Sequence, residues 1–259
     1  MAVKSQAPIT LYRGFATTNT HVWSPFVNKL ETRFRLAGIT YRVDVGGPRQ
    51  GPRGKIPYIA YGEGGELIGD TALITRRLVS DGIVTDLNAQ LSPAEKAIDL
   101  SVRSLCEDKM SFLMARERWV DNYYLMRDGA LAALPWLVRC VVGNLVYRKV
   151  TGALYGQGTG RYTDEEVREM RRGVWEALSD LLAERRKVVR DREAPFWVLG
   201  REEPTEADAT VYALVATGLV CTAAPDTQKI VREFPVLVDY ARRIHGKYFG
   251  DYDIWEEQV

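Results

Sequence analysis

The sequence predicts a small α/β domain followed by a larger, all-helical domain. Segments with the alternating pattern of β-strands occur only in about the first seventy residues, whereas helix start signals dominate the rest of the chain. Between the two regions, residues 81–91 contain turn residues and no sustained hydrophobic period. We therefore predict a first domain in residues 1–80, a linker in residues 81–91 and a helical domain in residues 92–259.

The composition is that of a folded globular protein with no strongly charged partner. Of the 259 residues, 46% are hydrophobic and 27% are charged, which is ordinary for a globular chain. The 35 basic and 34 acidic residues give a net charge of +1, so no overall field attracts nucleic acid or anionic membrane. We expect no nucleic-acid partner.

The cysteines and histidines indicate a reducing compartment and no metal site. Cys106, Cys140 and Cys221 lie far apart and form no ligand cluster, which argues against a zinc site or a disulfide framework. The two histidines, His21 and His245, are predicted to be surface or packing residues. The first residues lack the apolar core of a signal peptide. We therefore expect a cytoplasmic protein without a bound metal.

The first domain begins with a strand, a helix and a second strand. Residues 9–12 alternate apolar and polar side chains, and residues 41–45 do so again. Between them, residues 13–23 form a polar, irregular loop that leads to a helix beginning at Ser24. A strand, a helix and a strand in this order usually form a right-handed parallel unit.

The helix that begins at Ser24 presents an anion-binding end. Serine is a preferred N-cap residue, and Pro25 suits the first helical position because it needs no N–H partner there. Glu31 and Arg35 are predicted to pair at i,i+4 spacing, and Gly38 ends the helix. The free N–H groups and the positive end of the helix dipole suit a phosphate, a carboxylate or a thiolate.

A glycine-rich segment precedes the second half of the sheet. Residues 46–54 contain too many glycines and prolines for a full helix. Residues 56–61 then form a strand that begins at a special turn, for which we predict a cis bond before Pro57, because a central strand rarely tolerates proline. A short antiparallel strand follows at 66–68, and a helix capped by Asp70 comes next.

Three capping boxes open helices in the second domain, at Ser92, Thr163 and Thr205. The box at Thr205 ends on Asp208 and starts a nearly all-apolar helix, which is predicted to lie at the centre of the domain. We assign Asp208 wholly to structure because a capping box on a buried helix requires it.

The most apolar stretch of the chain, residues 130–147, is predicted to be part of a buried helix. It contains Pro135 and Arg139 and is only about long enough for a thin membrane crossing. The helix is expected over residues 131–150, with a kink near the proline. We expect no integral membrane segment.

Three short motifs resemble those of the glutathione transferase superfamily: Ser24-Pro25-Phe26, Lys55-Ile56-Pro57 and Asp70-Thr71. The resemblance covers nearly the whole chain and implies a thioredoxin-like domain followed by an all-helical domain. Within the superfamily, the chain is most similar to the branch that contains failed axon connections proteins and metaxins. Its Ser-Pro-Phe motif is similar to that of the Tau class.

The resemblance implies glutathione as co-substrate and gives Ser24 the central role. In transferases with a serine here, the hydroxyl donates a hydrogen bond to the glutathione sulfur. A free thiol titrates near pH ~8.5, and a donor at a helix N-terminus lowers this value, so Ser24 would stabilise the thiolate. Tyr12 is a rival donor, because other classes use a tyrosine at the end of the first strand. The alternative is that Ser24 serves only as a helix cap.

The resemblance implies that the motifs around Pro57 and Asp70 bind the peptide backbone and ends of glutathione. Around Pro57, the backbone of Ile56 would pair with the cysteinyl part of glutathione, as an added strand does. Asp70 and Thr71 would bind the ammonium and carboxylate of the γ-glutamyl part, unless they only cap their helix. The glycyl carboxylate would be met by a basic side chain, either Lys55 or Arg53.

The leading hypothesis is an enzyme that conjugates glutathione to an apolar electrophile, or catalyses elimination from one. We expect the electrophile to lie between the first domain and the helix that carries Arg116, Trp119 and Tyr123. Two departures from the usual pattern of glutathione transferases favour instead a non-catalytic binding or scaffold protein. The loop 13–23 is long enough to lie over the pocket mouth, and residues 46–54 replace a helix that normally contacts glutathione. A carrier of hydrophobic metabolites is a third hypothesis, and a homodimer stays open.

Overall fold

The first domain is built on a four-stranded mixed sheet with the strand order β2-β1-β3-β4. The computed structural model describes residues 7–189, 191 and 193–255. β1 pairs in parallel with β2 and antiparallel with β3, which pairs antiparallel with β4, so the predicted parallel unit and hairpin are confirmed. The strands are β1 (Ile9–Tyr12), β2 (Arg42–Asp44), β3 (Tyr58–Tyr61) and β4 (Glu66–Gly69).

Two helices, α1 (Pro25–Leu36) and α2 (Thr71–Ser80), contribute to the core of this domain. Leu11 of β1 and Ile59 of β3 are Cα partners, and both are fully buried in a cluster with apolar residues of the two helices. α1 ends as predicted, because Gly38 adopts a φ of +65° that favours glycine. The alternation of side chains along the strands thus gives the sheet one face that is buried under helices.

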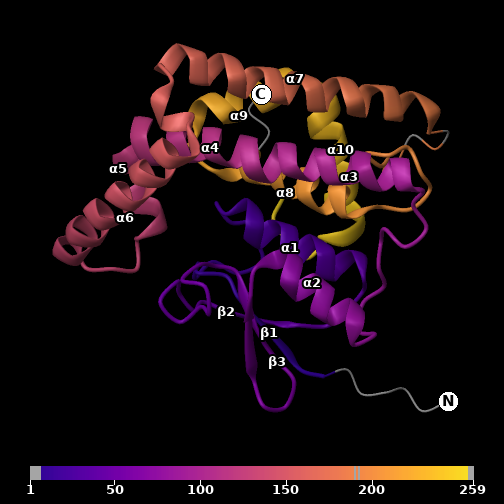
Figure 1. Cartoon of the computed structure of the whole chain (residues 1–259), viewed down its shortest axis with the longest axis horizontal. Helices are drawn as coiled ribbons and strands as arrows, with labels where there is room; N and C mark the ends of the chain where they lie inside the picture. Colours follow the sequence, from indigo (N-terminus) through magenta and orange to yellow (C-terminus); the bar gives the residue numbers. More distant parts are fainter. Residues whose placement is uncertain (1–6, 190, 192, 256–259) are drawn as a thin grey trace.

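The helical domain is organised around α8 (Glu206–Val220), whose residues 207–219 are all buried. Figure 1 shows α8 between α1 of the first domain and α7 (Asp164–Val188), which runs across the top of the view. α1 packs directly on α8 and so joins the two domains. The predicted fold class, an α/β domain followed by an all-helical domain, is confirmed.

Two wide π-helical turns, Leu105–Met110 and Glu117–Asp121, follow α3 and α4 in the first part of the helical domain. Each turn is continuous with the helix before it. The remaining helices of the domain are α3 (Pro93–Ser104), α4 (Ser111–Arg116), α5 (Tyr123–Ala130), α6 (Trp136–Gln157), α9 (Pro225–Glu233) and α10 (Pro235–Tyr248).

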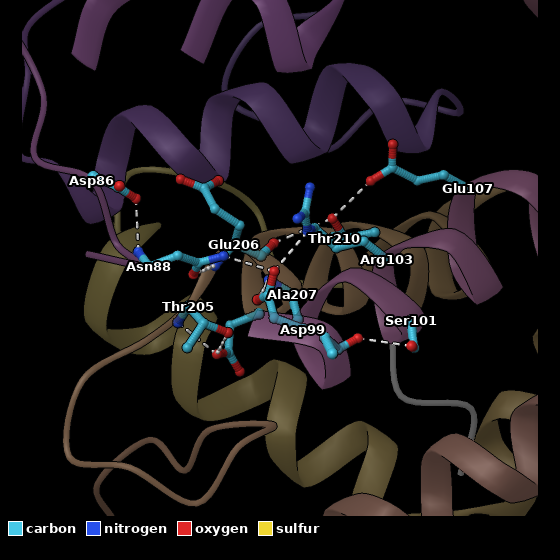
Figure 2. Close-up of polar contacts among 12 residues, drawn as sticks. Asp86, Asn88, Asp99, Ser101, Arg103, Glu107, Thr205, Glu206, Ala207 and Thr210 are labelled. Atoms are coloured by element: carbon cyan, nitrogen blue, oxygen red, sulfur yellow. Dashed lines mark hydrogen bonds and ion pairs between the residues drawn. The ribbon is translucent and has the colours of Figure 1, made fainter. Parts of the chain in front are cut away.

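Polar side chains satisfy the N-terminus of α8 (Figure 2). Asp208 closes the predicted capping box by accepting the Thr205 N–H at 2.8 Å, and its other oxygen accepts the Val198 N–H at 2.7 Å. Asp99 of α3 accepts the Ala207 N–H at 2.8 Å. Burial raises the pKa of Asp208 to about 6, against the opposing effect of these donors. The structural role predicted for Asp208 is confirmed.

The helix predicted over residues 131–150 is present from residue 136 onward, but the predictions of its start, its kink and its burial are wrong. α5 ends before this stretch and α6 begins after the proline, which therefore ends a loop instead of kinking a helix. In Figure 1 the two helices form a hairpin that projects from the body of the molecule. Within α6, only Gly143 and Leu154 are buried. The apolar composition of this segment therefore does not reflect a position in the core.

No single helix in the described ranges is long and apolar enough to cross a membrane. α8 and α9 pass that test only as a pair, across a bend of 117°. α8 is the buried central helix of the domain, which explains its composition.

The loop that leads into α1 is held by a buried ion pair. The side chains of Arg13 and Glu31 are both 0% exposed, and Nη2 of the first lies 3.3 Å from Oε2 of the second. The Tyr252 hydroxyl donates to Oε1 of Glu31 at 2.7 Å. Burial raises the pKa of Glu31, whereas Arg13 and Tyr252 act to lower it. The predicted pair between Glu31 and Arg35 is not formed, because Arg35 pairs instead with Asp251.

The two histidines lie in a buried aromatic cluster between the domains. His21 Nε2 lies 3.0 Å from the Tyr212 hydroxyl and 3.3 Å from Nδ1 of His245. Burial, followed by the nearby His245 and Arg13, lowers the pKa of His21 to about 3, and burial also lowers the pKa of His245. Both are packing residues, and within the described residues no group of His, Cys, Asp and Glu could hold a metal ion.

Acidification from about pH 7 to about pH 5 is expected to destabilise the protein through His21. The unfolded side chain titrates near pH ~6.5 and the folded one near pH 3, so between these values the unfolded chain binds more protons. Stability therefore falls as the pH drops below about 6.5, by at most about 1.4 kcal/mol per pH unit for this group. Urea unfolding of the wild type and of His21→Gln at both pH values measures the effect. An equal loss in the two proteins would contradict the assignment.

Candidate functional site

Ser24 lies at the start of α1 with a hydroxyl that the helix does not use. Its backbone is extended, with φ of −105° and ψ of 113°, and its carbonyl accepts the Asn28 N–H at 3.2 Å. The side chain makes no capping hydrogen bond, and the residue is partly exposed. Pro25 follows at the first helical position. A capping role alone does not account for this serine, since its hydroxyl is available beside the positive end of the helix dipole.

Asn28 holds the backbone at Val22, two residues before Ser24, through its side-chain amide. Its side-chain amide accepts the Val22 N–H at 3.0 Å and donates to the Val22 carbonyl at 2.8 Å. The same amide nitrogen donates to Oγ1 of Thr217, in α8, at 2.8 Å. From the other side, Arg118 donates to the carbonyl of the residue before Ser24 at 2.6 Å. These hydrogen bonds set the position of Ser24 relative to the helical domain.

The peptide bond before Pro57 is cis, as predicted. It follows a segment, residues 45–55, that contains turns and no helix, so the prediction that residues 46–54 form no full helix is confirmed. Ile56 is partly exposed and lies against Gly14, where a Cβ would meet its side chain at 2.5 Å. The two basic residues predicted to meet the glycyl carboxylate, Arg53 and Lys55, are exposed.

Asp70 caps α2 with one carboxylate oxygen. Its Oδ1 accepts two backbone N–H groups of the first helical turn, at 3.0 and 3.2 Å. Its Oδ2 makes no hydrogen bond within the part of the chain that the structure describes, and the φ of +79° is unusual for a residue with a side chain. Thr71 is buried behind it. Arg53 lies nearby, because a Cβ at Gly69 would meet its Cγ at 3.7 Å. The capping role of Asp70 therefore leaves an oxygen for a ligand.

The Tyr12 ring packs on the face of the sheet opposite to the face that the helices cover. Its ring stacks on that of Tyr58, with centroids 4.5 Å apart and planes 13° from parallel. Gly46, with φ of +54°, comes so close that a Cβ would meet the Tyr12 ring at 2.6 Å. Its neighbour Leu11 faces the core under the helices, and the alternation of the strand turns Tyr12 the opposite way. The structure thus gives Tyr12 a packing role.

A small pocket opens beside the start of α1, between the two domains. Lys29 Nζ lies 2.6 Å from Oε1 of Glu107, and the Thr210 hydroxyl donates to the same oxygen at 3.1 Å; Figure 2 shows this second contact. Burial raises the pKa of Cys106 to about 12, so this thiol is not a nucleophile at neutral pH. The pocket is lined by Pro25, Phe26, Lys29, Cys106, Glu107, Ser111, Thr210 and Leu214.

The structure separates the three residues predicted to bind the electrophile. Trp119 packs in a small apolar cluster with Trp23, the residue before Ser24. Arg116 instead forms ion pairs with aspartates at the end of its own segment and at the start of α7. Tyr123 packs its ring edge-on against a tyrosine of α6 and buries its hydroxyl there. Of the three, Trp119 alone shares a cluster with the residue next to Ser24.

The polar wall of the pocket was not predicted from the sequence. Lys29, Glu107 and Thr210 come from three separate elements, and the pair Lys29 and Glu107 is 78 residues apart in the chain. No motif joins them. In the structure, Lys29 lies on α1, and the residues that follow it, 30–34, are all buried. A lysine that is 6% exposed needs a partner, and Glu107 is that partner.

A sheet with a cis-proline turn, joined to a helical domain built on one buried helix, defines the fold class of the glutathione transferases. Residues 25–124 match the family model described as the glutathione S-transferase N-terminal domain, and residues 174–244 match the model of the C-terminal domain. Together the two models span most of the chain. The chain therefore belongs to the glutathione S-transferase superfamily, and the predicted enzyme class, a glutathione transferase, is confirmed.

Individual relatives agree with this class. The chain is 27% identical over 243 residues to an isoprene-epoxide–glutathione S-transferase of Rhodococcus sp. strain AD45, covering 87% of this chain and 92% of the relative. Among solved structures, a glutathione transferase of Phanerochaete chrysosporium matches with a TM-score of 0.61 at 15% identity, over 94% of this chain and 99% of the other. A glutathione S-transferase of Methylobacterium radiotolerans, in complex with glutathione sulfonate, matches with a TM-score of 0.55 at 13% identity, over 97% of each chain.

Proposed function

We propose that the protein conjugates glutathione to a small apolar electrophile, with Ser24 as the residue that stabilises the thiolate. The observation that carries this proposal is the Ser24 hydroxyl, which lies at a helix N-terminus and makes no capping hydrogen bond. A hydroxyl donor and a helix dipole together favour the charged form of a thiol placed there. Glutathione is accordingly the co-substrate, and no step requires a metal.

An epoxide is the electrophile class that we favour, because the relative from Rhodococcus is named for one. The thiolate sulfur attacks one epoxide carbon, so a C–S bond forms as the C–O bond breaks. The ring oxygen stays on the product as an alkoxide and takes a proton from water, while the thiol proton has left to solvent. In this step Ser24 donates a hydrogen bond to the sulfur and does not itself attack.

Glutathione would be held along the edge formed by β3 and the start of α2. The Ile56 backbone at the cis turn would pair with the cysteinyl part, and the unused Oδ2 of Asp70 would accept from the γ-glutamyl ammonium. Thr71 would donate to the γ-glutamyl carboxylate. The glycyl carboxylate would meet one of the exposed cations of the turn, Arg53 or Lys55.

The electrophile would enter beside the start of α1. We propose that Phe26 and Ser111, which line the small pocket there, contact it, and that Trp119 shapes the approach through the apolar cluster that it shares with Trp23. Arg116 and Tyr123 have other partners and are left with structural roles in this proposal.

A non-catalytic binding or scaffold protein of the same fold is the second candidate. It is favoured by the absence of a helix in residues 45–55, where glutathione contacts are normally supplied. The similarity to the failed axon connections and metaxin branch points the same way and remains part of this proposal. The three free cysteines support the proposed cytoplasmic location.

Calorimetric titration with reduced glutathione, followed by mass spectrometry of its mixture with a small apolar epoxide, distinguishes the two candidates. The proposed enzyme binds glutathione saturably and yields a thioether whose mass is the sum of the two reactants. Saturable binding without an adduct above the uncatalysed background would favour the scaffold. No heat at millimolar glutathione would overturn the glutathione site itself.

Asp70→Asn is expected to weaken glutathione binding by about tenfold with little change in stability. The amide oxygen still caps α2, since Asn and Asp are similar N-caps, but the charge toward the ammonium is lost. Asp70→Ala should weaken binding in the same way and also lower the free energy of unfolding by about 1 kcal/mol. Calorimetry and urea unfolding measure the two effects. Undiminished binding in Asp70→Asn would remove this residue from the site.

A further inference from the structure

The hairpin of α5 and α6 exposes an apolar surface that no described residue covers. Trp136 and Leu137, at the start of α6, are 65% and 71% exposed, and Tyr124 of α5 is 70% exposed. We call this set the hairpin surface; its members are Tyr124, Leu125, Trp136, Leu137, Val138, Val141 and Leu145. Leu137, Val141 and Leu145 follow one another at i,i+4 spacing and so lie on one side of α6. An exposed apolar area of this kind marks an interaction site.

Most of the hairpin surface lies in a stretch of the chain whose charged residues are all basic. Residues 129–163 contain no Asp or Glu, although the whole chain has 34 acidic residues, and they include four basic residues. Arg148 and Lys149 are exposed and continue the side of α6 that carries Leu145. Asp128, just before this stretch, is already paired with Arg127 and lies 3.7 Å from Arg139. The surface therefore combines exposed apolar side chains with uncompensated positive charge.

We propose that the hairpin surface docks on an anionic lipid bilayer. A helix with exposed apolar residues and flanking cations lies in the membrane interface, its apolar side at the boundary of headgroups and acyl chains and its cations near the lipid phosphates. Trp136 suits this boundary because its ring is apolar and its indole N–H is polar. α6 is not apolar enough along its length to span a bilayer, so the docking is peripheral.

A second copy of the chain fits this surface less well than lipid. Symmetric pairing of two hairpins would bring together two stretches without carboxylates, so Arg148 and Lys149 would gain no counter-charge from the partner's equivalent stretch. Anionic phosphates supply that counter-charge. The net charge of +1 on the whole chain shows that any attraction to lipid is local to the hairpin.

The hairpin lies close to the proposed reaction site. The Trp23 ring packs against α5 so tightly that a Cβ at Gly129 would lie 2.1 Å from it, and Trp23 precedes Ser24. Docking would therefore hold the start of α1 near the layer in which apolar compounds dissolve. The docking itself does not depend on conjugation, and its test uses no glutathione.

Cosedimentation of the full chain with vesicles tests the proposal. Vesicles of phosphatidylcholine alone are compared with vesicles that also contain phosphatidylglycerol, at about 0.15 M salt. We expect binding to the mixed vesicles to be at least about tenfold stronger than to the neutral ones. Quenching of tryptophan fluorescence by brominated lipid should fall in Trp136→Phe, because this tryptophan would lie in the interface.

Two pairs of variants separate the apolar and ionic parts. Leu137→Ser with Leu145→Ser should abolish vesicle binding, whereas Ile98→Ser with Leu100→Ser, two exposed apolar residues on α3, should not. Arg148→Glu with Lys149→Glu should weaken binding to the mixed vesicles at least about tenfold, whereas Arg168→Glu with Lys229→Glu, on α7 and α9, should have little effect.

Three outcomes would overturn the proposal. These are no binding to either vesicle, equal binding to neutral and anionic vesicles, and equal loss in the hairpin and control variants. Sedimentation velocity of the same proteins adds a fourth. If the Leu137→Ser and Leu145→Ser pair converts a dimer into a monomer, the hairpin surface is an interface between two copies of the chain. All these variants change exposed residues, so their folding is checked by circular dichroism.

Discussion

Ser24→Ala is expected to lower kcat/KM for glutathione conjugation by about 100-fold. The substitution removes the proposed donor to the thiolate, and losing one such donor in other enzymes costs about 10²–10³ in rate. Because the Ser24 side chain makes no capping hydrogen bond, the free energy of unfolding should change by less than about 0.5 kcal/mol. The pKa of the bound glutathione thiol, read from its thiolate absorbance against pH, should rise toward ~8.5.

Tyr12→Phe is the matched control for this experiment. It removes the rival hydroxyl but keeps the ring that stacks on Tyr58, so activity and stability should stay near those of the wild type. If Ser24→Ala is unaffected and Tyr12→Phe loses activity, the donor is Tyr12. If both retain full activity, the thiolate is stabilised by something other than a side-chain hydroxyl.

Glu31→Ala is expected to destabilise the protein by about 3–5 kcal/mol. The substitution leaves the Arg13 guanidinium buried without its counter-charge, and removing one partner of a buried ion pair typically costs this much. It also removes the acceptor of the Tyr252 hydroxyl, so the contact between α1 and the C-terminal segment is lost. Urea unfolding at neutral pH measures the change.

Two controls separate burial from charge. Glu176→Ala removes an i,i+4 partner of Arg172, but both side chains are about half exposed, so the loss should stay below about 1 kcal/mol. The double variant Arg13→Met with Glu31→Met should recover much of the stability, because an apolar pair needs no compensation in the core. A loss below about 1 kcal/mol in Glu31→Ala would show that the buried pair contributes little.

Local signals in the sequence were sufficient for most of the fold. The boxes at Ser92, Thr163 and Thr205 cap their helices as predicted, because a capping box involves residues only three positions apart. The failure at α6 has a physical reason. Apolar composition reports what a segment would gain by burial, but not whether the fold supplies a surface to bury it against. The predicted pair between Glu31 and Arg35 does not form, because each residue pairs with a side chain from elsewhere in the chain: Glu31 with Arg13 and Arg35 with Asp251.

Local signals also placed some of the candidate site residues in the fold. Ser24 and the cis bond before Pro57 belong to short motifs and are where the sequence placed them. The side on which Arg116 and Tyr123 lie depends on the π-helical turns before them. Such turns use more residues than the usual 3.6 per turn, so they rotate every later side chain around the helix axis. A regular helical period carried across residues 105–121 therefore assigns the wrong side.

The hydrogen bond between Asn28 and Thr217 has a consequence for how the protein is made. The strands and both helices of the first domain leave the ribosome early and can begin to fold there. The carbonyl before Ser24 accepts from Arg118, and Asn28, which holds the backbone of Val22, donates to Thr217; both of these partners emerge much later. A nascent chain thus carries Ser24, the proposed donor to the thiolate, through most of its synthesis before that serine is positioned, and the proposed reaction site is completed only when the central helix docks.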